Sequence, residues 1–512
     1  MTSRTRRDFL ADVGRGMLTA SLGSGLCFDL GLSSAFADDA PEKLSFGALE
    51  PLVGLMQDTP LEKLLPALAA ELAKGTELRQ LVAAGALANA RTFGGQDYIG
   101  HHTFMALGPA FAMANELPKE TQALPVFKVL YRNTNRMHER GGSKEEKLHP
   151  VHGEPAKSGD MQAASRGADM DEAERRFAKL AKEDAGEAFN HQLMAVQDEV
   201  DVHRVVLLWR AWSTLDLTGK EQAHTLLRQS VRYCVDNERT MIGQKRAPSG
   251  IRTLLPKLLD ENKLPGKTPG TKAGDDAWVR KLADVIYGGS RDQAAAAVAV
   301  ALGEGFSPES VGQAMSLAAN DLTLRDPGRP KAWASDAKPV GSVHGDSPGV
   351  HASDSANAWR NISRVSNARN AVASLIVGAY HTAGQTRAEF AKTSLPESDQ
   401  LVKKMAKDPA GLLKQLEAAI RANDQVTATV TVHHYGEQGH AAKDVFALLR
   451  GFAISEDGAL HAEKYYRTVT EESAAARPAF KWQYLTALAR VTASEFGHPA
   501  PGYAESKRVL KV

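Results

Sequence analysis

Apolar residues recur at the spacing of an α-helix along most of the chain, and this periodicity constrains the fold more than any other feature. In Leu61–Ala90 they lie three and four residues apart, and Gly75-Thr76 divides the run into two helices. Tyr98–Leu117 is apolar on nearly all sides, which predicts a buried central helix. Abundant alanine and an aromatic content of only 6% also favour helices over sheets. We therefore expect an all-α fold, a multi-helix globular array of helical hairpins with long loops rich in Gly, Pro and His, and at most one short β hairpin.

One segment departs from the helical pattern. Between Val426 and Val432, valine and alanine alternate with threonine, which is the period of two that is typical of a strand. We interpret this segment as a strand, with a helix forced by tertiary packing as the alternative.

The N-terminus has the pattern of an export signal. A basic head precedes the uncharged run Gly16–Phe28, and Ala35-Phe36-Ala37 supplies the small residues of a cleavage site. The pair Arg6-Arg7, followed by Phe9-Leu10, resembles the twin-arginine (Tat) export signal of bacteria.

This resemblance covers the first 37 residues only. It implies the Tat export machinery as a partner, and a periplasmic or secreted location after cleavage near Ala37. The uncharged run is shorter than the ~20 residues that cross a bilayer, so we expect no stable membrane anchor in the mature form. Cys27 raises a lipoprotein alternative, although Leu26 stands before it where lipidation needs a small residue. Proteins of this export class generally cross the membrane folded, and many of them carry a cofactor.

Changes in composition divide the chain into regions. Two stretches are rich in Gly, Pro and charged residues and poor in bulky apolar ones, which is typical of linkers and surface loops. The regions we expect are the Tat signal peptide 1–37, an N-terminal helical region 38–138, a polar linker or mobile loop 139–170, a central helical region 171–245, an irregular linker 246–276, and a C-terminal helical region 277–512 that carries the histidine loops.

Composition and missing motifs exclude several classes of function. The 62 basic and 61 acidic side chains nearly cancel, so we expect no nucleic-acid partner. Beyond residue 37, Cys234 is the only cysteine, so neither an intramolecular disulfide nor an iron–sulfur cluster is expected. The chain lacks Cys-x-x-Cys-His for haem c, His-Glu-x-x-His for a zinc protease, and a Gly-x-Gly-x-x-Gly turn after a strand for a Rossmann nucleotide.

Several histidines fall where apolar residues are expected. His203 continues the apolar stripe of one helix, and Glu199 lies four residues earlier, so the pair could present an imidazole and a carboxylate to one metal ion. His101-His102 begins the buried helix, and because adjacent residues point about 100° apart we expect only one of them, His102, to face the core. A buried histidine that hydrogen-bonds to a polar neighbour is the alternative for each.

Two loops carry a matching pattern. His344 and His351 are separated by six residues and followed by Asp354, and His433 and His440 have the same spacing before Asp444. Imidazole and carboxylate groups on glycine-bearing loops are suitable ligands for a divalent cation, although loop histidines are often only solvated.

His461 follows Asp457-Gly458 at the start of a helix, and we interpret it as a capping or core-edge histidine.

These observations favour an exported, metal-dependent oxidoreductase that acts on a small organic substrate. We expect a divalent metal ion, most of all iron in a non-haem site, with copper or zinc as alternatives. A non-covalent haem with an axial histidine is a further alternative. The expected ligands are His102, Glu199, His203, His344, His351, Asp354, His433 and His440, and no residue is assigned a catalytic role. A non-catalytic helical binding or scaffold protein is the main alternative, and a metal-assisted hydrolase or lyase is the second.

Overall fold

Side-chain caps fix where several of the central helices begin. The Asp97 carboxylate accepts the Gly100 amide hydrogen at 2.8 Å at the start of α5 (Tyr98–Ala114). Asp201 accepts the His203 amide hydrogen at 3.1 Å at the start of α10 (Val202–Thr218). Such caps satisfy amide groups that have no partner inside the helix.

The computed structural model describes residues 42–392 and 399–512, so the predicted twin-arginine signal and the expected cleavage near Ala37 lie outside the described residues. Within these ranges the chain is helical without a strand, and only isolated bridges such as Lys272 with Phe306 have extended pairing. The all-α prediction is confirmed. Lys43–Val512 forms one compact unit.

The first half of the described chain contains ten α-helices and three short 3-10 helices: η1 (Gly47–Leu49), α2 (Glu50–Asp58), α3 (Leu61–Ala73), α4 (Leu78–Phe93), α5 (Tyr98–Ala114), α6 (Ala123–Glu139), η2 (Gly142–Lys144), α7 (Met161–Arg166), α8 (Met170–Glu183), α9 (Ala185–Val196), α10 (Val202–Thr218), η3 (Lys220–Gln222) and α11 (Ala223–Gly243).

The second half of the described chain continues in the same way: α12 (Ile251–Glu261), α13 (Asp276–Gly288), α14 (Arg291–Gly303), α15 (Pro308–Leu324), η4 (Lys331–Trp333), α16 (Pro348–Val365), α17 (Ala368–Ala383), α18 (Ala388–Lys392), α19 (Asp399–Val402), α20 (Pro409–Arg421), α21 (Gln425–Glu437), α22 (Ala442–Ser455), η5 (Gly458–Leu460), α23 (His461–Ala475), α24 (Lys481–Glu495) and α25 (Tyr503–Leu510). Each of the described helices is too short or too polar to span a membrane.

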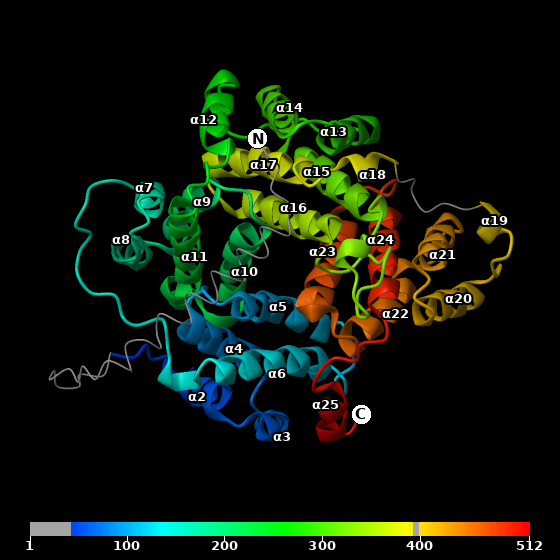
Figure 1. Ribbon diagram of the computed structural model, residues 1–512, viewed down its shortest axis with the longest axis horizontal. Coiled ribbons are helices and arrows are strands. Elements are labelled where there is room, and N and C mark those ends of the chain that lie inside the picture. The colour runs from blue at the N-terminus through cyan, green and yellow to red at the C-terminus, as the bar shows by residue number, and fades with distance from the viewer. Residues whose placement is uncertain (1–41, 393–398) are drawn as a thin grey trace. The chain divides into compact units, whose positions relative to one another are not determined.

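Helices α5, α10, α16 and α23 come from distant parts of the sequence, and each of them packs against two of the others. Helix α5 packs against α10 and α23, and α16 packs against the same two helices (Figure 1). The buried central helix predicted from Tyr98–Leu117 is α5, whose residues are mostly inaccessible to solvent.

Two hydrophobic cores meet at this set of helices. The larger core includes Phe104 of α5 and Ala352 of α16. The smaller core is built mainly from helices α20 to α24 and also includes Met113 of α5 and Val350 of α16. Helices α5 and α16 therefore lie at the boundary between the two cores.

The strand predicted for Val426–Val432 is wrong, because this segment lies inside α21. The Thr429 and Thr431 hydroxyls donate to the carbonyl oxygens four residues earlier, those of Gln425 and Thr427. The threonine hydroxyls thereby form hydrogen bonds within the helix itself. Helix α21 packs against α20 and α24, so tertiary packing outweighs the β-propensity of valine and threonine.

Some segments expected to be irregular contain helices. Helix α12 occupies the middle of 246–276, and α7 lies within 139–170. His351 and His433 were expected on loops but lie in helices α16 and α21. His344 and His440 do lie between helices.

Candidate metal centre

The four neighbouring helices bring five histidines together. His101 and His102 come from α5, His203 from α10, His351 from α16 and His461 from α23; we call these five residues the histidine cluster. The ring centroids of His102 and His203 are 4.7 Å apart, and those of His351 and His461 are 5.5 Å apart. The two pairs also contact each other, because the centroid distances are 5.3 Å from His102 to His461 and 5.9 Å from His203 to His351.

Hydrogen bonds fix which nitrogen of His102 and of His203 carries the proton. Nδ1 of His102 lies 2.6 Å from the carbonyl oxygen of Tyr98, which can only accept, so Nδ1 donates. Nδ1 of His203 lies 3.3 Å from Oδ1 of Asp201 and donates in the same way. In the neutral rings Nε2 is then the unprotonated nitrogen, and the two Nε2 atoms stand 3.1 Å apart. When both rings are neutral the two Nε2 lone pairs face each other, whereas a His203 ring that carries a second proton donates its Nε2 hydrogen to Nε2 of His102.

His101 completes a group of three imidazoles. Nitrogens of His101, His102 and His203 lie within 4.8 Å of one another, with no carboxylate oxygen in the group. Both ring nitrogens of His101 are buried and have no hydrogen-bond partner among the described residues. Burial lowers the pKa of His101 to about 3 and holds the pKa of His102 well below its usual value. Both rings are therefore neutral near pH 7, the form that binds metal.

His351 and His461 form a second pair. Their Nε2 atoms are 3.4 Å apart. Nδ1 of His461 lies 3.1 Å from the carbonyl oxygen of Ala459 and donates to it, so its Nε2 is also left as a lone pair. Burial lowers the pKa of His351 to about 3 and that of His461 well below its usual value.

Three charged groups surround the cluster. The Asp201 carboxylate also accepts a hydrogen bond from the Tyr233 hydroxyl, and these bonds hold the pKa of Asp201 well below its usual range even though burial opposes ionisation. Burial lowers the pKa of Lys464, one turn after His461, to about 8. Asp354, one turn after His351, is buried and accepts from the Thr468 hydroxyl at 2.7 Å.

Tyr98 covers part of the cluster. Its ring lies 4.4 Å from the ring of His102 and 5.4 Å from those of His101 and His203. The residue is nevertheless 54% exposed, and its neighbour Ile99 is exposed as well. The cluster therefore lies one side chain below an apolar part of the surface.

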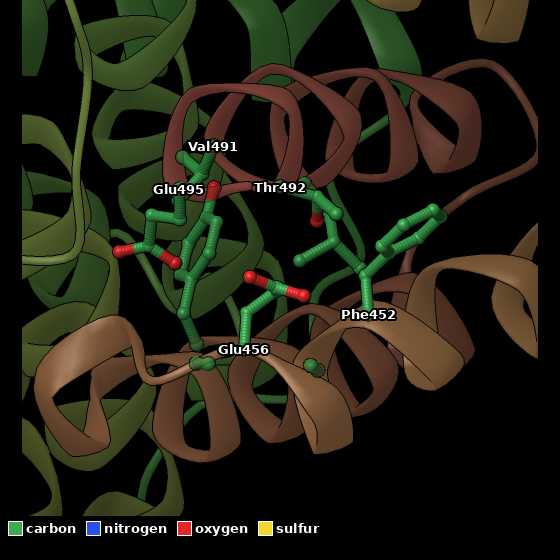
Figure 2. Close-up of a pocket in the computed structure, with 9 residues that line it drawn as sticks. Phe452, Glu456, Val491, Thr492 and Glu495 are labelled. Carbon is green, nitrogen blue, oxygen red and sulfur yellow. The ribbon is translucent and has the colours of Figure 1, made fainter. Parts of the chain in front are cut away.

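A second buried feature adjoins the cluster without including it. A cavity of about 20 Å³, enough for a single water molecule, is enclosed by α22, α23 and α24. The side chains of Glu456 and Glu495 line it (Figure 2). Glu495 accepts the Gly345 amide hydrogen at 2.8 Å, and burial raises the pKa of Glu495 to about 8.

The structure brings together three of the residues singled out in the sequence, namely His102, His203 and His351. Asp354 lies one turn from His351 on α16, but its Oδ1 accepts a hydrogen bond from the Thr468 hydroxyl. His344 is buried with its Nε2 unpartnered among the described residues, and burial lowers its pKa to about 4. It has no ring contact with the cluster, although the adjacent Gly345 packs against His461.

The other proposed ligands have different surroundings. The helical pairing of Glu199 with His203 is wrong, because Glu199 lies in the turn before α10 and accepts the Ser249 amide hydrogen at 3.2 Å. Asp201 takes its place beside His203. The half-exposed His433 lies 3.4 Å from Glu437, and His440 packs on the ring of Tyr435.

Sequence reasoning missed His101, His461 and Asp201. Both adjacent histidines of α5 face protein because neighbouring helices enclose this helix on more than one side. The role of Asp201 could have been predicted from the sequence. An aspartate two residues before a histidine at the start of a helix can cap the helix and also contact the imidazole.

No protein-family model, curated protein or solved structure matches this chain. Its function is therefore inferred from the chemistry of the cluster.

Proposed function

We propose that this chain is an exported metal-dependent oxidoreductase whose histidine cluster binds copper and acts on a small organic substrate. The single observation that carries the proposal is the opposition of the Nε2 lone pairs of His102 and His203 at 3.1 Å. Facing lone pairs repel each other, and either a proton or a metal ion held by the two Nε2 atoms removes this repulsion. Burial and the nearby Lys464 keep the pKa of His102 low, so near pH 7 its Nε2 is unprotonated and available to bind a metal ion.

The donor atoms favour copper over the iron expected from the sequence. Non-haem iron sites commonly include a carboxylate ligand, whereas the three nitrogens that lie together here are all imidazole. Asp201 faces Nδ1 of His203 rather than the shared Nε2 side. A carboxylate in this position orients a metal-binding histidine and raises its basicity.

Zinc is the second candidate, because imidazole nitrogens suit zinc as well as copper. A zinc ion at the same three histidines would supply a metal-bound hydroxide, and the chain would then be a hydrolase or lyase. The identity of the bound metal separates these two functions.

The spacing of the rings argues against a haem between these histidines. The ring centroids of His102 and His203 are 4.7 Å apart. A metal ion can lie between these rings at a bonding distance of about 2 Å from the Nε2 atom of each. A porphyrin ring is too large to fit between them.

The proposed reaction couples substrate oxidation to dioxygen. An imidazole-bound copper ion supplies one-electron redox chemistry. In the balanced reaction the organic substrate loses two electrons and two protons, and dioxygen gains them as hydrogen peroxide. Tyr98, whose ring contacts that of His102, and its neighbour Ile99 offer an exposed apolar surface, where we expect an aromatic or apolar substrate to approach.

Metal binding by the purified chain tests the proposal. The chain is stripped with a chelator, reconstituted with Cu⁺ or Zn²⁺, desalted and analysed for metal. We expect tight, stoichiometric binding that His203→Gln weakens strongly, and copper-dependent oxygen consumption with phenolic or other small aromatic substrates.

The matched control is His433→Gln, which changes a half-exposed histidine outside the cluster and should bind metal as the unaltered chain does. A chain that retains no metal, with a melting temperature that chelator does not change, would support the scaffold alternative instead.

The twin-arginine signal fits this proposal. Export in the folded state allows a metal to be loaded before the chain crosses the membrane. We therefore propose a periplasmic or secreted location for the mature protein.

A further inference from the structure

We propose that a second divalent metal ion binds between His351 and His461, next to the ion held by His101, His102 and His203, so that the cluster is a dinuclear centre. This inference rests on the metal site proposed above, and it adds a site, a stoichiometry and a pair of ligands to it.

The distance within the second pair fits two ligands of one ion. Nitrogens that bond a metal at about 2.0–2.1 Å in tetrahedral geometry stand about 3.3–3.4 Å apart. The Nε2 atoms of His351 and His461 are 3.4 Å apart. The same two nitrogens are within reach of an N–H···N hydrogen bond, which a bound metal ion would replace.

The backbone before His461 is strained in a way that orients this ring. Ala459 has φ 48° and ψ 40°, and Leu460 has φ 66°, so two successive residues with side chains occupy the left-handed region. Such conformations are costly for residues other than glycine and are concentrated at functional sites. Here they direct the Ala459 carbonyl oxygen at Nδ1 of His461, 3.1 Å away. The strained turn therefore fixes the protonated nitrogen and leaves Nε2 free to bind.

Gly345 packs against the base of the His461 side chain. A Cβ atom at this position would lie 2.1 Å from the Cβ of His461. The Gly345 amide donates to Glu495 at 2.8 Å, which holds the loop in place. The loop can therefore pack against His461 only because residue 345 has no side chain.

The second pair is close enough to the first for the two ions to share a ligand. The ring of His461 lies 5.3 Å from that of His102, and the ring of His351 lies 5.9 Å from that of His203. Two-metal enzymes hold their ions about 3.5–4 Å apart. Two protein ligands on the second ion also leave coordination positions for water, hydroxide or substrate.

Metal stoichiometry tests the inference on the whole chain, with Zn²⁺ alone as the probe. We expect two Zn²⁺ per chain after reconstitution and desalting, and one per chain in His461→Gln and in His351→Gln. Gly345→Ala should also bind one, because the new methyl group displaces His461 without removing a ligand. His433→Gln is the control and should bind two.

The outcomes separate the two proposals. One Zn²⁺ per chain, unchanged by His461→Gln and His351→Gln, overturns the second site and leaves the first. No bound Zn²⁺, together with no bound copper when Cu⁺ is supplied instead, overturns both. The unaltered chain provides a readout without any variant: two adjacent Cu²⁺ ions couple magnetically, so the integrated paramagnetic resonance signal should fall below the copper content. Full signal intensity from two bound ions per chain overturns the dinuclear centre.

Discussion

Replacing Asp201 with asparagine should weaken metal binding at His203 while leaving helix α10 intact. The carboxylate accepts from Nδ1 of His203 at 3.3 Å, from the His203 amide at 3.1 Å and from the Tyr233 hydroxyl. Asparagine caps a helix about as well as aspartate does, so the amide contact survives, but the negative charge beside the imidazole is lost.

The expected size follows from the role of the lost charge. Partners that hold the far nitrogen of a metal-binding histidine are worth about 10–100-fold in metal affinity. This corresponds to about 1.4–2.7 kcal/mol of binding free energy. Asp201→Ala should lose the same affinity and in addition about 0.5–2 kcal/mol of stability from the missing cap.

A competition titration of Zn²⁺ against a chromophoric chelator measures the affinity, and thermal unfolding of the metal-free chain measures the stability. The control is Asp275→Asn, because Asp275 caps α13 by accepting from the Trp278 amide at 2.8 Å and has no contact with the cluster. Wild-type affinity in Asp201→Asn would refute the role assigned to the Asp201 charge in metal binding. A metal-free melting temperature as low as that of Asp201→Ala would show that the cap, not the charge, was removed.

Three further predictions concern stability and export. Lys128→Met should destabilise the fold by about 3–5 kcal/mol in denaturant titrations, because it leaves the fully buried Glu463 without its partner at 2.5 Å. Adding Glu463→Leu should recover part of the loss, with the remainder due to the Ala453 and Glu456 carbonyl oxygens that also accept from Lys128, and no recovery would contradict the ion-pair explanation. Burial raises the pKa of Glu495 from 4.5 to about 8, so its contribution to stability is complete below pH 4.5 and is lost as pH rises through 8, at up to about 1.4 kcal/mol per pH unit. Glu495→Gln should therefore gain stability relative to the unaltered chain between about pH 5 and 8, and a pH-independent difference would show that Glu495 does not titrate in this range. Replacing Arg6 and Arg7 together with lysine should leave an uncut precursor in the cytoplasm on immunoblots, and normal export would contradict the twin-arginine assignment.

The helical fold was predictable because it follows from local periodicity. The break at Gly75-Thr76 and the buried helix after Asp97 are both present, as the end of α3, the start of α4 and the whole of α5. The pattern failed at Val426–Val432, where alternation indicated a strand. Threonine hydroxyls that bond to the preceding turn, together with packing on two sides, stabilise a helix there, and neither effect is visible in the spacing of apolar residues.

The candidate centre was predictable only in part. His102, His203 and His351 stood out because each interrupts an apolar or glycine-bearing pattern. His461 did not, because its surroundings depend on the strained turn at Ala459 and Leu460 and on a loop more than 100 residues away. The matching spacing of the two histidine loops did not identify the cluster, since the contacts of His433 are to its own helix.

The metal in the mature chain tests the central claim most directly. The protein would be purified from the periplasm, the location proposed for it, without added metal or chelator, and analysed by elemental analysis and X-ray absorption. We expect stoichiometric copper, two ions per chain, with the scattering pattern of several imidazole ligands at about 2 Å. A chain that carries no transition metal, and that rebinds none when copper or zinc is supplied, would contradict the account.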